Sequence, residues 1–118
     1  MTESFSQVNR RALLQRVDGD LELLKELVEI FFSTYKANID NLKDLLESKD
    51  FLALEQAAHS FKGTLQTFFN GKLIEGIYKI ELSAREQDLE SSRSALAEFI
   101  QIVALSSETL NDLHQYIE

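Results

Sequence analysis

FLALEQAAHSFKGTLQTFF, the stretch at residues 51–69, decides the fold of this chain. Successive residues of an ideal helix are rotated by about 100°. At that spacing, five apolar residues gather within about 40° of one direction: Leu54, Ala58, Phe61, Leu65 and Phe68. Asp50 is suited to cap the start of this helix, and the Asn70-Gly71 pair to end it. The stretch is therefore predicted to be an amphipathic helix that packs on a core.

The same helical spacing of apolar residues continues on both sides of this stretch. Four further helices are predicted, over residues 6–17, 21–48, 72–87 and 90–117. The chain has no proline and only four glycines, so few positions interrupt a helix. Because the connections are short, neighbouring helices should be antiparallel. The predicted fold class is all-α: an antiparallel, up-down-up-down four-helix bundle with a short additional N-terminal helix, formed by residues 1–118 as a single domain.

The composition of the 118 residues argues against several classes of function. Asp and Glu number 20 against 12 Lys and Arg, and this net charge of −8 disfavours nucleic acid or an anionic membrane as a partner. Cysteine is absent and only His59 and His114 could supply imidazole, so we expect no metal site and no cofactor. Neither a membrane span nor a secretory signal is visible, which predicts a cytoplasmic protein.

The exposed face of the helix at residues 51–69 carries almost no charge. His59 lies about 140° from the core direction and Gly63 about 180° from it. Lys62 follows His59 by three residues and can reach the same patch. An exposed face depleted of charge is typical of a docking surface. The residues predicted to form this surface are Leu52, Gln56, Ser60, Gly63, Gln66 and Thr67.

An exposed imidazole beside a cation and a cleared surface is suited to one kind of chemistry. Imidazole is a nucleophile near neutral pH and can carry a phosphoryl group on a ring nitrogen. Lys62 would offset the phosphoryl charge. No phosphate-binding loop is present, so the partners of such a carrier would supply the catalysis. The alternative is a helical adaptor that binds partners through the neutral face without phosphorylation. His114 is interpreted as a surface histidine.

The run Ala58-His59-Ser60-Phe61-Lys62-Gly63-Thr64 resembles the A-H-x-[hydrophobic]-K-G-[ST] signature of histidine phosphotransfer (HPt) domains. The resemblance covers nearly the whole chain. It implies a four-helix bundle that is not an enzyme by itself and that shuttles phosphate between the aspartates of response-regulator receiver domains. His59 matches the phosphoacceptor, Lys62 the lysine beside the phosphoryl group, and Gly63 the glycine that clears the docking surface. Glu81 falls where the family often has a Gln or Glu that orients the imidazole.

The resemblance also implies the partners. These are receiver domains, which would carry the Mg²⁺, and a sensor histidine kinase, with the chain itself expected to be a monomer. The sequence departs from the family pattern at Phe69, where a glycine is usual, and at Leu65, where a small residue is usual. Thr67-Phe68 is similar to the phosphoacceptor domain of chemotaxis kinases, which an attached ATP-binding domain phosphorylates. The sequence leaves both donors open, and also whether the chain is free-standing or a module of a hybrid kinase.

Overall fold

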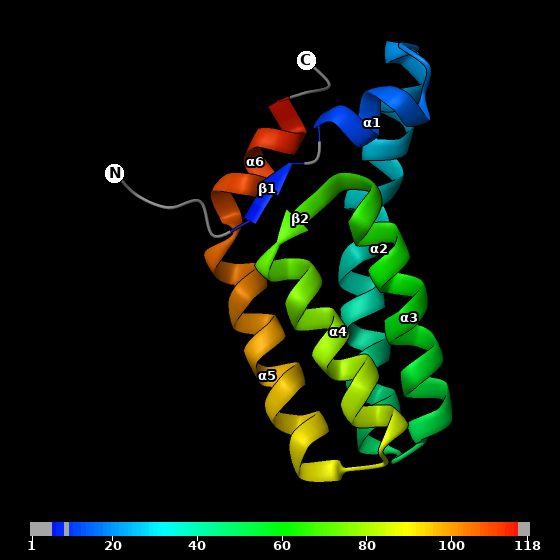
Figure 1. Ribbon diagram of the computed structural model, residues 1–118, viewed down its shortest axis with the longest axis vertical. Coiled ribbons are helices and arrows are strands. Elements are labelled where there is room, and N and C mark those ends of the chain that lie inside the picture. Colours follow the sequence, from blue (N-terminus) through cyan, green and yellow to red (C-terminus); the bar gives the residue numbers. More distant parts are fainter. Residues whose placement is uncertain (1–5, 9, 116–118) are drawn as a thin grey trace.

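Figure 1 shows a computed structural model, which describes residues 6–8 and 10–115. Four long helices lie side by side, with consecutive helices running in opposite directions: α2 (Leu21–Glu47), α3 (Phe51–Phe68), α4 (Lys72–Arg85) and α5 (Leu89–Leu105). One end of the bundle carries the short helices α1 (Arg10–Arg16) and α6 (Ser107–Gln115) and two short strands, β1 (Ser6–Val8) and β2 (Phe69–Gly71). The predicted class, a four-helix bundle with a short N-terminal helix, is confirmed. Within these described residues, no helix is both long and apolar enough to cross a membrane.

Aspartates cap three of the long helices. The Asp20 carboxylate accepts hydrogen bonds from the N–H groups of Glu22 and Leu23 at the start of α2, both at 3.1 Å. Asp50 accepts from the N–H of Ala53 at 3.1 Å in the same way in α3. Asp88 accepts from the N–H of Ser91 at 3.0 Å and caps α5. Each cap satisfies backbone donors that a helix start leaves unpaired, which stabilises the fold by about 1 kcal/mol per cap.

The core lies between the long helices and is built mainly from aliphatic and aromatic side chains. All five apolar residues predicted to form the buried side of α3 are buried. The Phe31 ring of α2 packs on Phe68 and Phe69, with ring centroids 5.0 Å and 5.5 Å apart. Phe69, the residue at the usual glycine position, is thus part of the core. Leu21, the first residue of α2, is 66% exposed although the helical spacing places it with the buried Leu24 and Val28.

The N-terminal segment differs from its prediction. A helix was expected over residues 6–17, whereas Ser6–Val8 forms β1 and helix α1 begins only at Arg10. β1 pairs antiparallel with β2, so that Ser6 is opposite Gly71 and Val8 opposite Phe69. The backbone at Phe69 is extended, with φ −135° and ψ 164°, and therefore offers its polar groups to a strand. This tertiary pairing overrides the local helical pattern, and it also ends α3 at Phe68.

The last predicted helix is divided in two. Helix α5 ends at Leu105, and Ser106 has φ −91° and ψ 17° with its N–H bonded to the carbonyl of Ile102 at 2.9 Å. Serine competes with the helical backbone for hydrogen bonds, so it favours such a break. Helix α6 then follows and packs against β1. Ile117, the predicted end of this helix, lies outside the described residues.

Helices α4 and α5 approach each other closely at Gly76. This glycine is buried, and a Cβ atom added to it would lie 3.0 Å from Ile102 Cδ1 and 3.1 Å from Phe99 Cδ1. Few real Cβ contacts are this short, because interiors are packed to near crystal density. The absence of a side chain at Gly76 therefore allows the contact between the two helices.

Candidate functional site

His59 lies near the middle of α3, on the side turned away from the core. Its side chain is 69% exposed, although its Nδ1 atom lies 3.1 Å from the Oε2 atom of Glu81. Glu81 belongs to α4, which packs antiparallel beside α3. The helix pair thus brings together two residues that are far apart in the sequence. One ring nitrogen is held by a neighbouring helix, and the rest of the imidazole faces outward.

Glu81 is a buried carboxylate with basic groups around it. Its side chain is only 4% exposed. Lys62 Nζ lies 2.7 Å from Oε1, and Arg85 Nη2 lies 3.1 Å from Oε2. A charged carboxylate is rarely buried unless such partners compensate for the water that it loses. Glu81 is therefore a buried, partnered carboxylate, and its Oε2 atom contacts the imidazole.

These contacts determine the charge of Glu81. Burial alone would raise the pKa of its carboxyl group, but the hydrogen bonds and charges of Lys62 and His59 outweigh burial and lower this pKa below its usual value. The group is therefore ionised at neutral pH and can only accept hydrogen bonds. It follows that Nδ1 of His59 carries the proton in this contact, and that the lone pair of the neutral ring is on Nε2.

Lys62 is bound to its own protein rather than projecting freely into the predicted patch. Its side chain is 16% exposed and ends against Glu81. The ammonium also lies over the ring of Tyr78, 4.5 Å from the ring centroid, in a cation–π contact. Both partners come from α4. The lysine thus links α3 to α4 directly beside His59.

The structure adds two residues that the sequence reasoning did not assign to the site. Arg85 of α4 contacts Glu81 and also binds Glu55 of α3, with Nε 2.7 Å from Glu55 Oε2. Glu55 lies four residues before His59 on α3, but its carboxylate binds Arg85, whose pKa it raises. A signal for Arg85 was present in the sequence, because Glu81 and Arg85 are spaced as neighbours on one helix face.

The predicted docking surface lies around His59 on α3. Leu52, Gln56, Ser60, Gly63 and Gln66 are exposed, and Thr67 is half-buried. In the part of the chain that the structure describes, no atom outside the local helix lies within 4 Å of the position that a Cβ atom would take at Gly63. The surface is therefore open where the sequence predicted free space.

A groove of about 450 Å³ runs beside this surface, between α3 and α2. Ser60, Gly63 and Thr67 line its α3 side, and Ile30 lines the α2 side. Arg16, in the last turn of α1, also lines this groove. The short N-terminal helix thus contributes a cation to the edge of the docking surface.

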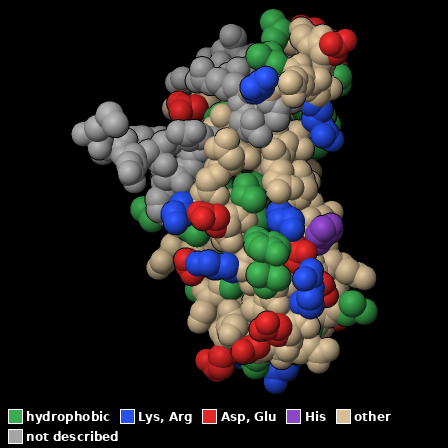
Figure 2. Space-filling model, in the orientation of Figure 1, with side chains coloured by type: hydrophobic (Ala, Val, Ile, Leu, Met, Phe, Trp, Pro, Cys, Tyr) green, Lys and Arg blue, Asp and Glu red, His purple; other side chains and the backbone are tan. Residues whose placement is uncertain are grey.

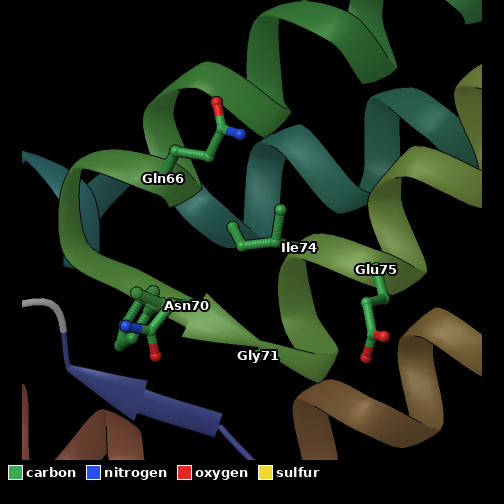
Figure 3. A pocket seen from close by; sticks show the side chains of 6 residues that line it. Gln66, Asn70, Gly71, Ile74 and Glu75 are labelled. Atoms are coloured by element: carbon green, nitrogen blue, oxygen red, sulfur yellow. The ribbon is translucent and has the colours of Figure 1, made fainter.

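A second hollow, of about 560 Å³, lies at the junction of α3 and α4. Figure 3 shows Ile74 and Gln66 reaching toward it from the two helices, with Asn70 and Glu75 farther along its rim. Neither His59 nor Glu81 lines this hollow. On the face of the molecule formed by α4 and α5, acidic and basic side chains are intermixed (Figure 2), in contrast to the neutral exposed face of α3.

A metal site and the second histidine are the other features that could take part in chemistry. The described part of the chain contains no group of three or more His, Asp or Glu side chains that could hold a metal ion. His114 belongs to α6, which lies outside the helix pair α3 and α4 that forms the site.

Comparison with known proteins identifies the family. Residues 26–116, from within α2 to beyond α6, match the family model of the Hpt domain. No curated protein and no solved structure gives a significant match. The matched region includes both helices that form the site, α3 with His59 and α4 with Glu81. The chain therefore belongs to the Hpt domain family.

Proposed function

We propose that this chain accepts a phosphoryl group on His59 from the phospho-aspartate of a receiver domain and passes it to another response regulator. Membership of the Hpt family implies histidine phosphotransfer in a phosphorelay. The proposal adds the acceptor residue and the direction of transfer. One observation carries it: the His59 side chain is 69% exposed while its Nδ1 atom is held by a buried, charged carboxylate.

In the proposed step, the Glu81 carboxylate keeps the proton on Nδ1, so the lone pair on Nε2 faces the partner. Nε2 attacks the phosphorus of the aspartyl phosphate. The new N–P bond forms as the P–O bond to the aspartate breaks, and the aspartate carboxylate leaves with the electron pair. The proton stays on Nδ1, and the positive charge of the ring lies beside Glu81. Delivery to the next aspartate is the reverse of this step.

Hpt domains are carriers and are generally not independent enzymes. In this proposal, the receiver domain supplies the reacting aspartate and its own Mg²⁺, and this chain supplies an oriented nucleophile without a cofactor. Lys62 would balance the charge of the phosphoryl group as well as that of Glu81, because its ammonium lies one helical turn from His59. The mechanism thus depends on positioning and charge compensation.

The proposed docking surface for the receiver comprises Leu52, Gln56, Ser60, Gly63, Gln66 and Thr67. Its lack of charge and the open space at Gly63 support this assignment. A sensor histidine kinase is the proposed source of the phosphate upstream of the receiver. We further propose that residues 1–118 form one domain that acts as a monomer in the cytoplasm.

The test is transfer from a phosphorylated receiver domain to the purified chain, followed by assay for acid-labile, base-stable phosphate. His59→Gln should fold normally, because an exposed side chain contributes little to stability, and should accept no phosphate. His114→Gln is the matched control and should be labelled like the wild type. Labelling of His59→Gln would contradict the assignment of the acceptor.

The same assay separates the alternatives. Labelling only by an ATP-loaded kinase domain would identify a kinase-linked phosphoacceptor of the chemotaxis type. Binding of a receiver with no labelling by either donor would identify a helical adaptor. Labelling by the phosphorylated receiver supports the proposed carrier.

A further inference from the structure

One oxygen atom of Glu81 is shared between two donors. His59 Nδ1 and Arg85 Nη2 both lie 3.1 Å from Oε2, whereas Lys62 Nζ contacts the other oxygen, Oε1. Donors on one carboxylate oxygen compete for its charge. The strength of the hydrogen bond between Glu81 and the His59 imidazole must therefore depend on Arg85.

Arg85 is itself held in place by Glu55. Its Nε atom lies 2.7 Å from Glu55 Oε2, so different nitrogens of one planar guanidinium bind carboxylates on two helices. Glu55 lies one turn before His59 on α3, and Glu81 lies one turn before Arg85 on α4. The arrangement links the two helices on one side of the imidazole, as the contact between Lys62 and Glu81 links them on the other.

We propose that Arg85 is a positioning residue for phosphotransfer, which acts on His59 through the shared oxygen of Glu81. A carboxylate that accepts the proton of one imidazole nitrogen makes the ring more basic. A cation on the same oxygen offsets part of that effect. Arg85 would thus keep more of the imidazole neutral near pH 7, with the lone pair on Nε2 available for attack. The effect on transfer rests on the proposed function, whereas the effect on the basicity of His59 does not.

The charged side chains of α3 and α4 around His59 all belong to the same set of ion pairs. From α3 these are Glu55 and Lys62, and from α4 they are Glu81 and Arg85. On the α2 side of the groove, the lining residues are uncharged, and α1 adds Arg16 at its edge. Tyr78 lies under the Lys62 ammonium. Arg85 is the cation that shares its carboxylate oxygen directly with the ring.

The experiment is an NMR titration of the His59 ring in the wild type, Arg85→Gln and Lys79→Gln. Lys79 is the matched control, because it also lies on α4 and also binds a glutamate of a neighbouring helix, Glu98 on α5, at 3.2 Å. We expect Arg85→Gln to raise the titration midpoint of His59, and Lys79→Gln to shift it much less. The rate of transfer from a receiver near pH 7 should fall by about twofold in Arg85→Gln, because less of the imidazole is then neutral.

Arg85→Lys keeps the charge but cannot bind two carboxylates with separate nitrogens. In this variant, the titration midpoint of His59 and the rate of phosphotransfer should therefore lie between those of the wild type and Arg85→Gln. This variant also tests the proposal if Arg85→Gln does not fold. Equal midpoint shifts in the Arg85 and Lys79 variants would overturn the proposal. A raised midpoint with an unchanged transfer rate would overturn the role in transfer. Labelling of His59→Gln would instead contradict the proposed function, and the titration would still report on the contact.

Discussion

Gly63 and Gly76 are both glycines inside helices, but their surroundings are opposite. Gly63 lies on the exposed face of α3, and among the described residues no atom outside the local helix lies within 4 Å of an added Cβ. Gly76 lies between α4 and α5, where an added Cβ would meet Ile102 and Phe99 at 3.0 Å and 3.1 Å. A helical glycine costs roughly 1 kcal/mol relative to alanine, so each position requires a compensating reason. At Gly76 this reason is the close contact of two helices, and at Gly63 our proposal is access for a partner.

The largest effect is expected for transfer in Gly63→Gln. A side chain there would hold the receiver away from His59, and a misplacement of about 1 Å can slow a reaction on the order of a hundredfold. The same variant should be more stable than the wild type by roughly 0.5–1 kcal/mol, because glutamine is the better helix former. Transfer kinetics and urea denaturation measure the two effects. A variant that is more stable and transfers normally would place the docking surface elsewhere.

The second prediction compares alanine at both glycines. The added methyl group is free of contacts at position 63 but overpacks the core at position 76, where Phe99 is fully buried. We therefore expect Gly76→Ala to be less stable than Gly63→Ala by about 1–3 kcal/mol. Urea denaturation of the two variants measures this difference. Equal stabilities would mean that α4 and α5 separate easily, and the contrast between the two glycines would then be lost.

Lys62 is the residue before Gly63 in the sequence. Unlike Gly63, it contacts the neighbouring helix α4. Lys62→Met keeps most of the side-chain stem and removes a cation from the buried Glu81 carboxylate. We expect a loss of about 1–2 kcal/mol in the free energy of unfolding, since Arg85 and His59 still contact Glu81. Unchanged stability would show that Arg85 compensates fully.

Low pH should weaken the contact between α3 and α4 at Glu81, but it should not weaken the packing of α4 on α5 at Gly76. The folded-state pKa of Glu81 is lowered from 4.5, so the unfolded state binds protons more readily as the pH falls. The stabilisation is complete above the unfolded pKa and is lost as the pH falls through the folded pKa. Between about pH 6 and pH 3, the wild type should lose more stability than Glu81→Gln does. Identical pH profiles in urea denaturation would contradict the stabilising role of the charged Glu81.

The core side of α3 could be predicted from the sequence because helical spacing is a local property. Leu54, Ala58, Phe61, Leu65 and Phe68 are all buried as expected. His59 could be placed on the exposed face for the same reason. Local spacing could not show that residues 6–8 form a strand, because their partner, Phe69–Gly71, lies far away in the sequence. Local spacing could not show the role of Gly76, which depends on α5, or the contact of Arg85 with Glu55 on α3.

The β1–β2 ribbon has a consequence for the order of folding. It joins residues 6–8 to residues 69–71, so its formation closes a loop that contains α1, α2 and α3. Closing so long a loop costs more entropy than forming the short connection between α4 and α5. Contacts between helices adjacent in the sequence should therefore appear earlier than the ribbon does. The ribbon would then close the chain at the end of folding.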